Sequence, residues 1–368
     1  MGSRSEEIFS YAYGVEDNGN VESDPQSEFK SENILFLAHS LSEVAQKCGK
    51  SEEEIRLVLE ESKKRLFEVR AHRPRQQLDD KVLTSWNGLM ISALARASSI
   101  LAEEKYLKGS ERAATFIQNR LYEPKNCQLY RSWRKEERKV KGIADDYAFL
   151  TQGLIDLYES SFEPRWLEWA IELAEEQNKR FFDLERGGFY MTQVQENRDL
   201  LLRVKEDSDN VEPSASSVAT LNLLRLAQFT ARKDFQESAE NTLKLYVSQM
   251  NEQPRSLPQM MVALNFALTQ PCQIIIAGDK KSAETQRLIK EVNSSFIPNK
   301  ILMLLDQTPS DQILQKHLPF LQKIVPIKNK PTVYVCSNYD CELPTNDPVV
   351  LRQILDRKLS TRTSVENM

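Results

Sequence analysis

Acidic residues gather in three segments that are far apart in the chain, and carboxyl groups brought together from such segments can transfer protons. The segments begin with Asp79 and Asp80, with Asp145 and Asp146, and with Asp207 and Asp209. Two carboxyl groups at a suitable separation act as general acid and general base, and in glycoside hydrolysis that separation decides between retention and inversion of configuration. We therefore predict that Asp80 and Asp146 form a catalytic pair.

Side chains beside these acids suit the recognition of a sugar. Carboxylates and amides bond hydroxyl groups, while aromatic rings such as those of Trp86 and Tyr147 stack on the C–H faces of a sugar ring. The predicted substrate-binding residues are Asp79, Trp86, Asn87, Asp145, Tyr147, Arg203, Asp207 and Ser214. A second interpretation stays open for each acid, which is that it caps the first turn of its own helix. Capping does not explain Trp86-Asn87-Gly88, because Asn and Gly lower helix propensity.

An internal repeat would position the acidic segments. Arg120-Leu121-Tyr122 and Arg180-Phe181-Phe182 lie sixty residues apart, as do Leu129-Tyr130 and Phe189-Tyr190. Each repeat is predicted to hold an inner helix, an outer helix and a short β-hairpin. The predicted helices are 83–101 with 106–121 and 146–158 with 165–182, and the predicted strands are 128–133 with 138–141 and 189–193 with 200–205.

The period of the apolar residues predicts which helices are buried. Ile143, Tyr147 and Leu150 begin a series at steps of three and four that marks one face of a helix. The helix that begins near Trp86 is apolar nearly all round, so we expect it to lie inside. Further helices are predicted at 216–226, 235–250 and 260–268. Alternating buried and amphipathic helices predict a toroid of α-hairpins, in which the leading ends of the inner helices share one rim.

The chain after Gln270-Pro271 changes character, because strand and helix patterns alternate. Strands at 272–278, 301–305 and 332–335 with helices at 283–292, 312–318 and 348–355 predict a small parallel sheet. The predicted fold is mainly α, an incomplete α/α toroid of helical hairpins with small β-hairpins, plus a small C-terminal α/β unit. The predicted domains are an irregular segment at 1–30, the partial toroid at 31–270, the α/β unit at 271–357 and a loose tail at 358–368.

Composition excludes several classes of partner and site. With a net charge of −5 over 368 residues, neither nucleic acid nor an anionic membrane is expected as a partner, and no apolar run is long enough for a membrane span. Five widely spaced cysteines favour a reducing compartment, the cytoplasm, over a disulfide framework. Cys336 and Cys341 lack a second pair, which favours packing or redox over zinc. We therefore expect no metal and no cofactor.

Several motifs resemble one known family. They are Arg73-Pro74-Arg75, Leu78-Asp79-Asp80-Lys81-Val82-Leu83, Trp86-Asn87-Gly88-Leu89-Met90, Asp145-Asp146-Tyr147-Ala148, Gly187-Gly188-Phe189, Arg203-x-Lys205 and Tyr334-Val335-Cys336. In this order they resemble the spermatogenesis-associated protein 20 family. The resemblance implies a C-terminal portion, which in intact members follows a thioredoxin-like domain and the first helices of a six-hairpin glycosidase-like toroid. The chain departs from the family pattern at Gln76, Ala215 and Ser216.

Two hypotheses about function follow. About four and a half hairpins are predicted where a closed ring needs six, so apolar helix faces at the gap could bind a protein partner. The favoured hypothesis is a non-catalytic or redox-associated scaffold, with the role in spermatogenesis and fertility that the resemblance implies. The alternative is a carbohydrate-active enzyme, similar to a glycosidase or a sugar epimerase, that acts on a small carbohydrate. The epimerase is disfavoured because the chain has only three histidines.

Overall fold

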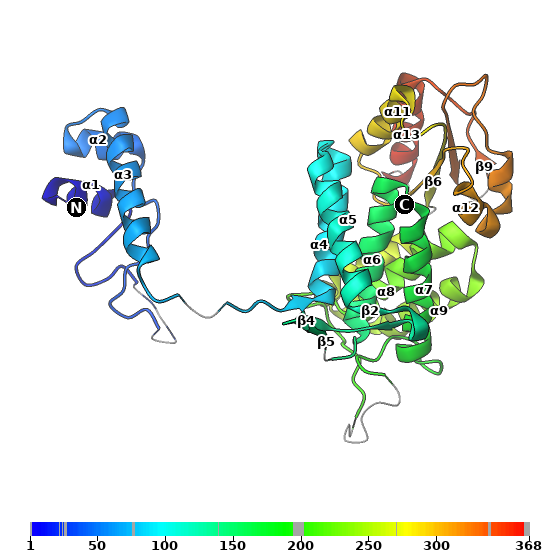
Figure 1. Cartoon of the computed structure of the whole chain (residues 1–368), viewed down its shortest axis with the longest axis horizontal. Helices are drawn as coiled ribbons and strands as arrows, with labels where there is room; N and C mark the ends of the chain where they lie inside the picture. Colours follow the sequence, from blue (N-terminus) through cyan, green and yellow to red (C-terminus); the bar gives the residue numbers. More distant parts are fainter. Residues whose placement is uncertain are drawn as a thin grey trace. The chain divides into compact units, whose positions relative to one another are not determined.

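The computed structural model divides the chain into two compact units, residues 1–79 and 80–368, which are described separately. It describes residues 2–21, 23, 25, 28–75, 78–138, 140–193, 202–269, 271–337 and 340–363. Gln76, where the sequence departs from the family pattern, lies outside these ranges. Figure 1 shows the elements of both units.

Unit 1 is a cluster of three helices, α1 (Ser3–Ala12), α2 (Leu41–Cys48) and α3 (Glu52–Ala71). Residues 1–30 were expected to be irregular, and α1 corrects that expectation. Ile8, Phe9 and Ala12 of α1 are buried against residues of α2 and α3, although the polar residues around them obscure the helical period. Ser51 and Glu54 have the spacing of a capping box in the sequence, and the structure forms this box at the start of α3. Helices α2 and α3 therefore pack with α1. The predicted toroid, residues 31–270, wrongly included them.

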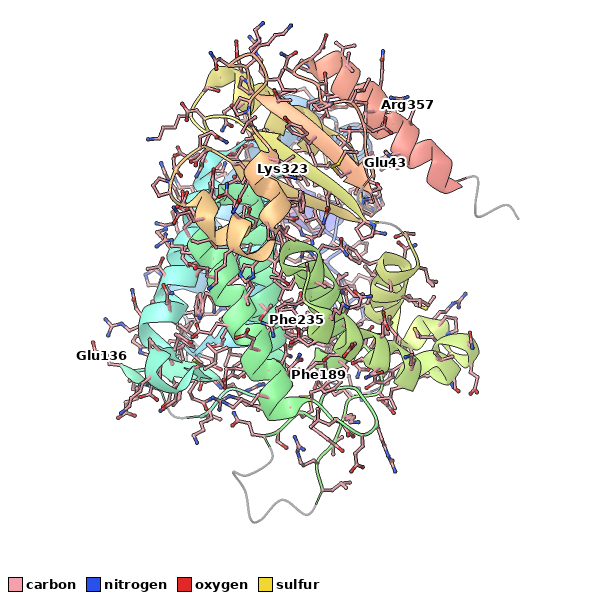
Figure 2. All side chains as sticks on the ribbon, turned by 90° about the vertical axis from the view of Figure 1, so that its right-hand side faces the viewer. Glu43, Glu136, Phe189, Phe235, Lys323 and Arg357 are labelled. Atoms are coloured by element: carbon pink, nitrogen blue, oxygen red, sulfur yellow. A yellow bond between two sulfur atoms is a disulfide. The ribbon has the colours of Figure 1, made fainter. Side chains whose placement is uncertain are left out.

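Unit 2 begins with an open arc of antiparallel helices. Its hairpins are α4 (Thr84–Leu101) with α5 (Glu104–Arg120), α6 (Ala144–Ser161) with α7 (Pro164–Phe181), and α8 (Ala215–Thr230) with α9 (Lys233–Glu252), followed by α10 (Pro258–Leu268). Helix α6 packs between α4 and α8, and α10 packs on the other side of α8. This inner row with its outer helices is the incomplete α/α toroid that the sequence predicts. Figure 2 shows Phe189 and Phe235 among these helices, and both are buried.

Burial along the inner helices differs from one helix to the next. Helix α6 is buried along most of its length, which includes the apolar face that its period predicts. In α4 the buried face carries Gly88, Ile91 and Ala95, whereas Trp86 and Ile100 are 58% and 71% exposed. The expectation that α4 is buried all round is therefore wrong. It lies at the start of the arc, where α5 and α6 cover only part of its surface.

Short β-ladders lie beside the starts of α4 and α6. Strand β4 (Ser132–Arg134) pairs with β1 (Val82–Leu83) and with β5 (Glu137–Arg138), while β2 (Tyr122–Glu123) pairs with β3 (Gln128–Leu129). In the second repeat, one backbone bond of 2.9 Å joins Met191 N to Val204 O. Residues 194–201, which include the predicted turn, lie outside the described ranges.

The α/β unit packs on the opposite end of the helices from these ladders (Figure 1). Its elements are β6 (Cys272–Ala277), α11 (Ala283–Ser294), β7 (Lys300–Leu305), α12 (Asp311–His317), β8 (Thr332–Ser337), β9 (Asp340–Cys341) and α13 (Pro348–Thr363). The strand order is β7-β6-β8-β9. Strand β6 is parallel to β7 but antiparallel to β8, so the predicted parallel sheet is only partly present.

The antiparallel strand follows from the position of α12. This helix packs on α7 and α8 of the toroid, and the chain then returns to the same end of the sheet, because Leu305 at the end of β7 and Thr332 at the start of β8 both pair with Ala277. Strand β8 therefore runs antiparallel to β6 and β7. The tail predicted to be loose from residue 358 instead continues α13 to Thr363, and residues 364–368 lie outside the described ranges.

Candidate functional site

The three acidic segments meet at one rim of the arc, as the sequence predicts. The carboxylate Oδ1 of Asp146, at the start of α6, accepts a hydrogen bond of 3.1 Å from the backbone N–H of Ser85, at the start of α4. The indole Nε1 of Trp86 donates to Oε1 of Glu212, in the loop before α8, at 2.6 Å. Helix starts that are 60 to 130 residues apart in sequence are therefore joined by direct hydrogen bonds.

Asp146 is a structural group in this rim. Its side chain is fully buried, and besides the Ser85 bond it accepts one of 2.9 Å from Ile143 N and lies 3.6 Å from Nη1 of Arg131. Burial raises the pKa of Asp146 to about 6, with the Ile143 N–H, Arg131 and Ser85 opposing the rise. Because an enclosed carboxylate cannot contact a substrate, the structure does not support the predicted catalytic role of Asp146.

Asp80 and Asp146, the predicted catalytic pair, differ in burial and in ion-pair partner. It is exposed and forms an ion pair with Arg134 of β4, whereas Asp146 lies beside Arg131. Arginines three residues apart in the chain thus hold the two acids separately. Each acid of the predicted catalytic pair therefore already has an arginine partner of its own.

Asp145 differs from its neighbour Asp146 in burial and in hydrogen bonding. It is half-buried, and its Oδ1 is buried without a hydrogen-bond partner among the described residues. Burial raises the pKa of Asp145 to about 7, with Glu206 and Asp146 adding to the rise and Arg131 opposing it. A carboxyl group with this pKa is partly protonated at neutral pH and can donate a proton.

Glu206 is a second acid of the rim, and the sequence did not single it out. Burial raises the pKa of Glu206, and the negative charge of Glu212 adds to the rise. Its backbone carbonyl accepts a hydrogen bond of 2.9 Å from the hydroxyl of Tyr246 on α9, which fixes this part of the loop. The only signal in the sequence was the acidic run Glu206-Asp207-Ser208-Asp209, which solvated loops also show.

Three other predicted binding residues form local or core contacts. The amide of Asn87 donates to the carbonyl of Leu83 at 2.8 Å. Tyr147 is fully buried, and its hydroxyl accepts a hydrogen bond of 3.0 Å from Leu129 N. Ser214 caps α8 by accepting a bond of 3.2 Å from Ser217 N. The structure therefore corrects the expectation that Tyr147 lines the mouth, and it favours the capping interpretation for Ser214.

The remaining predicted residues lie at several places. The Arg203 guanidinium lies 3.9 Å from the centre of the Tyr190 ring and donates to the carbonyl of Thr192 at 2.7 Å. Asp207 is exposed in the loop that carries Glu206. Asp79 is also exposed, and it is the last residue of unit 1. Trp86 thus stays at the rim together with the acids Asp145, Glu206 and Glu212.

Helix packing explains why the Trp86-Asn87-Gly88 motif ends in a glycine. A Cβ atom on Gly88 would lie 2.5 Å from the backbone of Phe149 in α6, and one on Gly153 would lie 2.6 Å from the carbonyl oxygen of Gly88. The two glycines therefore allow α4 and α6 to cross in backbone contact. Sequence reasoning noted the low helix propensity of Gly88 but not this contact.

Cys336 and Cys341 form a disulfide between paired positions of β8 and β9. The bond weakens the argument, drawn from the spacing of the cysteines, for a reducing compartment. Within the described ranges, no cluster of three or more histidines, cysteines or acids could hold a metal ion. Nor does any helix there have the length and apolar character needed to cross a membrane.

Comparison with known sequences shows the family. Human spermatogenesis-associated protein 20 is 36% identical in an alignment of 353 residues that covers 93% of this chain and 45% of the human protein. Over this length, the chain belongs to the spermatogenesis-associated protein 20 family. The mouse member is also 36% identical, and an uncharacterized protein of Caenorhabditis elegans is 31% identical over 94% of the chain and 48% of its own length. The chain spans about half the length of these family members. No protein-family model matches it.

Solved structures give only weak likenesses. A cellobiose 2-epimerase from Bacillus thermoamylovorans has a TM-score of 0.41 at 10% identity, over 73% of this chain and 68% of the epimerase. An inactive variant of an α-1,6-mannanase from a Salegentibacter species has a TM-score of 0.39 at 12% identity, over 87% and 85%. With TM-scores below 0.5, these likenesses carry no argument about the reaction.

Proposed function

We propose that the rim of the toroid binds a carbohydrate and that Asp145 donates a proton to it. The observation that supports this most strongly is the carboxyl of Asp145, which is only half-buried, unlike that of Asp146, and has a pKa raised to about 7. A general acid needs a pKa near the working pH, and burial among other acids supplies it. In a glycosidase-type reaction, Asp145 would protonate the oxygen of the leaving sugar.

The other rim residues have roles that complete this proposal. The indole of Trp86 is 58% exposed and is held through its N–H by Glu212, so its ring face is available to stack on a sugar. Glu206, when ionised, is the candidate base that activates water or the incoming hydroxyl. This assignment replaces the Asp80 and Asp146 pair, and it favours the enzyme hypothesis over the scaffold.

The test is to measure binding and turnover with the same protein. Isothermal titration with gluco- and manno-oligosaccharides, followed by hydrolysis of their aryl glycosides, should show binding that Trp86→Ala weakens at least tenfold and turnover that Asp145→Asn abolishes. Glu136→Gln is the matched control, because Glu136 lies on the outside of the unit at the turn after β4 (Figure 2). If no sugar binds, or if Glu136→Gln and Asp145→Asn lose activity equally, the proposal is wrong.

A second function, a scaffold that binds a protein partner, is favoured by the exposed face of α4. Met90 and Leu101 are about as exposed as Trp86 on this helix, and Ile100 is more so. A role in spermatogenesis enters this proposal only through the name of the relatives. Sedimentation and thermal unfolding test it. A chain that stays monomeric at high concentration and unfolds cooperatively at high temperature would contradict an unpaired interface on α4.

A further inference from the structure

A cavity of about 600 Å³ lies where the toroid meets the α/β unit. The inner helices α4, α6, α8 and α10 line one side, and the segment 293–300 between α11 and β7 lines the other. The cavity is distinct from the rim, because it adjoins the C-terminal halves of α4 and α6 at Arg96 and Asp156. The rim lies at the beginning of the same helices, beside the β-ladders (Figure 1).

Five ionisable side chains line this cavity. The two acids among them already have hydrogen-bond or ion-pair partners. Asp156 lies 2.7 Å from Nη2 of Arg225 and 2.8 Å from Nε of Arg96. Glu159 accepts from Nη2 of Arg225 at 2.8 Å through one oxygen and from Leu302 N at 3.0 Å through the other. Both carboxylates therefore have partners that match their charge.

Lys300 differs from the two arginines of the cavity, because its hydrogen-bond partner is a neutral side chain. Its Nζ donates to the side-chain carbonyl of Asn293 at 3.0 Å. Arg96, Arg225 and Lys300 against Asp156 and Glu159 leave one positive charge in excess (3 − 2 = 1). A buried cation is stable only when an opposite charge compensates it, so this arrangement favours the entry of an anion.

The surroundings of Lys300 disfavour its positive charge, and a bound anion would offset that effect. Burial lowers the pKa of Lys300, and although Glu159 opposes the shift, Arg96 and Arg225 add to it. The side chain of Arg225 is only 7% exposed, and its Nη1 donates to no acceptor in the described part of the chain. An anion near Lys300 would therefore meet one buried guanidinium group, that of Arg225, and one that solvent screens in part, because the side chain of Arg96 is 58% exposed.

The outer part of the cavity is apolar. Phe296, in the same segment as Asn293 and Lys300, is 84% exposed. Ile100 of α4 and Val262 of α10, which also line the cavity, are exposed in part of their surface. Exposed apolar side chains beside a charged interior suit a ligand with an apolar body and a charged end.

We propose that this cavity binds a small organic anion, either a phosphate monoester or a carboxylate. Its anionic group contacts Lys300 and the guanidinium groups of Arg96 and Arg225, and its apolar part lies against Phe296. This site does not depend on the carbohydrate proposal, because the cavity and the rim share no residue.

Phenyl phosphate and benzoate are the probes, with benzyl alcohol as their neutral counterpart. Titration calorimetry on the whole chain should show saturable binding of at least one anion and none of the alcohol. Whichever anion binds more tightly identifies the class of ligand. Equal binding of the alcohol, or no binding of either anion at millimolar concentration, would overturn the proposal.

Variants locate the binding. Lys300→Met should weaken binding of the anion at least tenfold, whereas Lys290→Met, which removes an exposed charge from α11 outside the cavity, should change it less than twofold. Phe296→Ala should weaken phenyl phosphate more than inorganic phosphate, and since Phe296 is exposed this variant retains the core. Equal losses in Lys300→Met and Lys290→Met, or a Phe296→Ala variant that binds phenyl phosphate unchanged, would place the anion elsewhere.

Discussion

The indole nitrogen of Trp86 and the carboxylate of Glu212 lie 2.6 Å apart although 126 positions separate them in the chain. This hydrogen bond connects the start of α4 to the loop before α8, across the start of α6. It holds an exposed aromatic ring beside two acids with raised pKa values. The bond therefore links the aromatic and the acidic parts of the proposed site.

Loss of the Trp86 partner should weaken sugar binding. Glu212→Ala removes the acceptor and should raise the dissociation constant for an oligosaccharide at least fivefold, since one hydrogen bond to a charged group contributes about 1.5–3 kcal/mol. Glu212→Gln retains a carbonyl oxygen that can accept the indole N–H and should lose less. Calorimetric titration measures both. Equal affinity in wild type and Glu212→Ala would show that the ring needs no such support.

Removing the charge at Asp145 should stabilise the protein at alkaline pH. In the folded chain the pKa of Asp145 is raised to about 7, well above the ordinary value of an aspartate. Folded Asp145 therefore holds its proton more tightly than the unfolded chain does, and stability falls as pH rises from about 4 through about 7. Asp145→Asn should raise the free energy of unfolding by about 1–3 kcal/mol at pH 8 and change it little at pH 4.

Urea unfolding of both proteins at the two pH values measures this effect. Glu136→Gln, an exposed acid outside the rim, is the control and should leave the pH dependence unchanged. A stability gain that is the same at pH 4 and pH 8 would mean that the charge of Asp145 is not the cause.

The close crossing of α4 and α6 should not tolerate a methyl group. Gly88→Ala would place Cβ 2.5 Å from the backbone of Phe149, and overpacking of this kind costs about 2–3 kcal/mol. Gly109→Ala on α5 is the matched control, because its nearest contact would be Leu94 Cδ1 at 3.4 Å. That change should gain about 0.5–1 kcal/mol from helix propensity. Chemical denaturation compares them, and a neutral Gly88→Ala would contradict the crossing.

The disulfide between Cys336 and Cys341 should contribute moderately to stability. It closes a loop with a sequence separation of 5, and loop-closure entropy then predicts about 2 kcal/mol. The double variant Cys336→Ala with Cys341→Ala should match the reduced wild type in urea unfolding and fall below the oxidised protein. Thiol alkylation without reductant provides an independent check, because both cysteines should resist labelling. Free labelling of Cys341 in the native protein would contradict the bond.

Local sequence patterns predicted the elements that depend on nearby residues. The period from Ile143 to Leu157 identified the apolar face of α6, and Ser51 with Glu54 identified the cap of α3. The repeat of helices and hairpins predicted that three distant acidic segments would share one rim. Each of these features follows from residues within one or two turns, or from a spacing that the sequence displays directly.

The sequence alone thus determined the fold class, the repeat and the acidic rim of this protein. Only the tertiary structure decided that Asp146 is fully buried, that its neighbour Asp145 is only half-buried, and that burial raises the pKa of Glu206. Adjacent carboxylates have the same chemistry in sequence, whereas their pKa values depend on burial and on charges from other helices. The same limit applies to α1, to the exposed face of α4 and to the antiparallel β8, because each depends on which distant element packs against it.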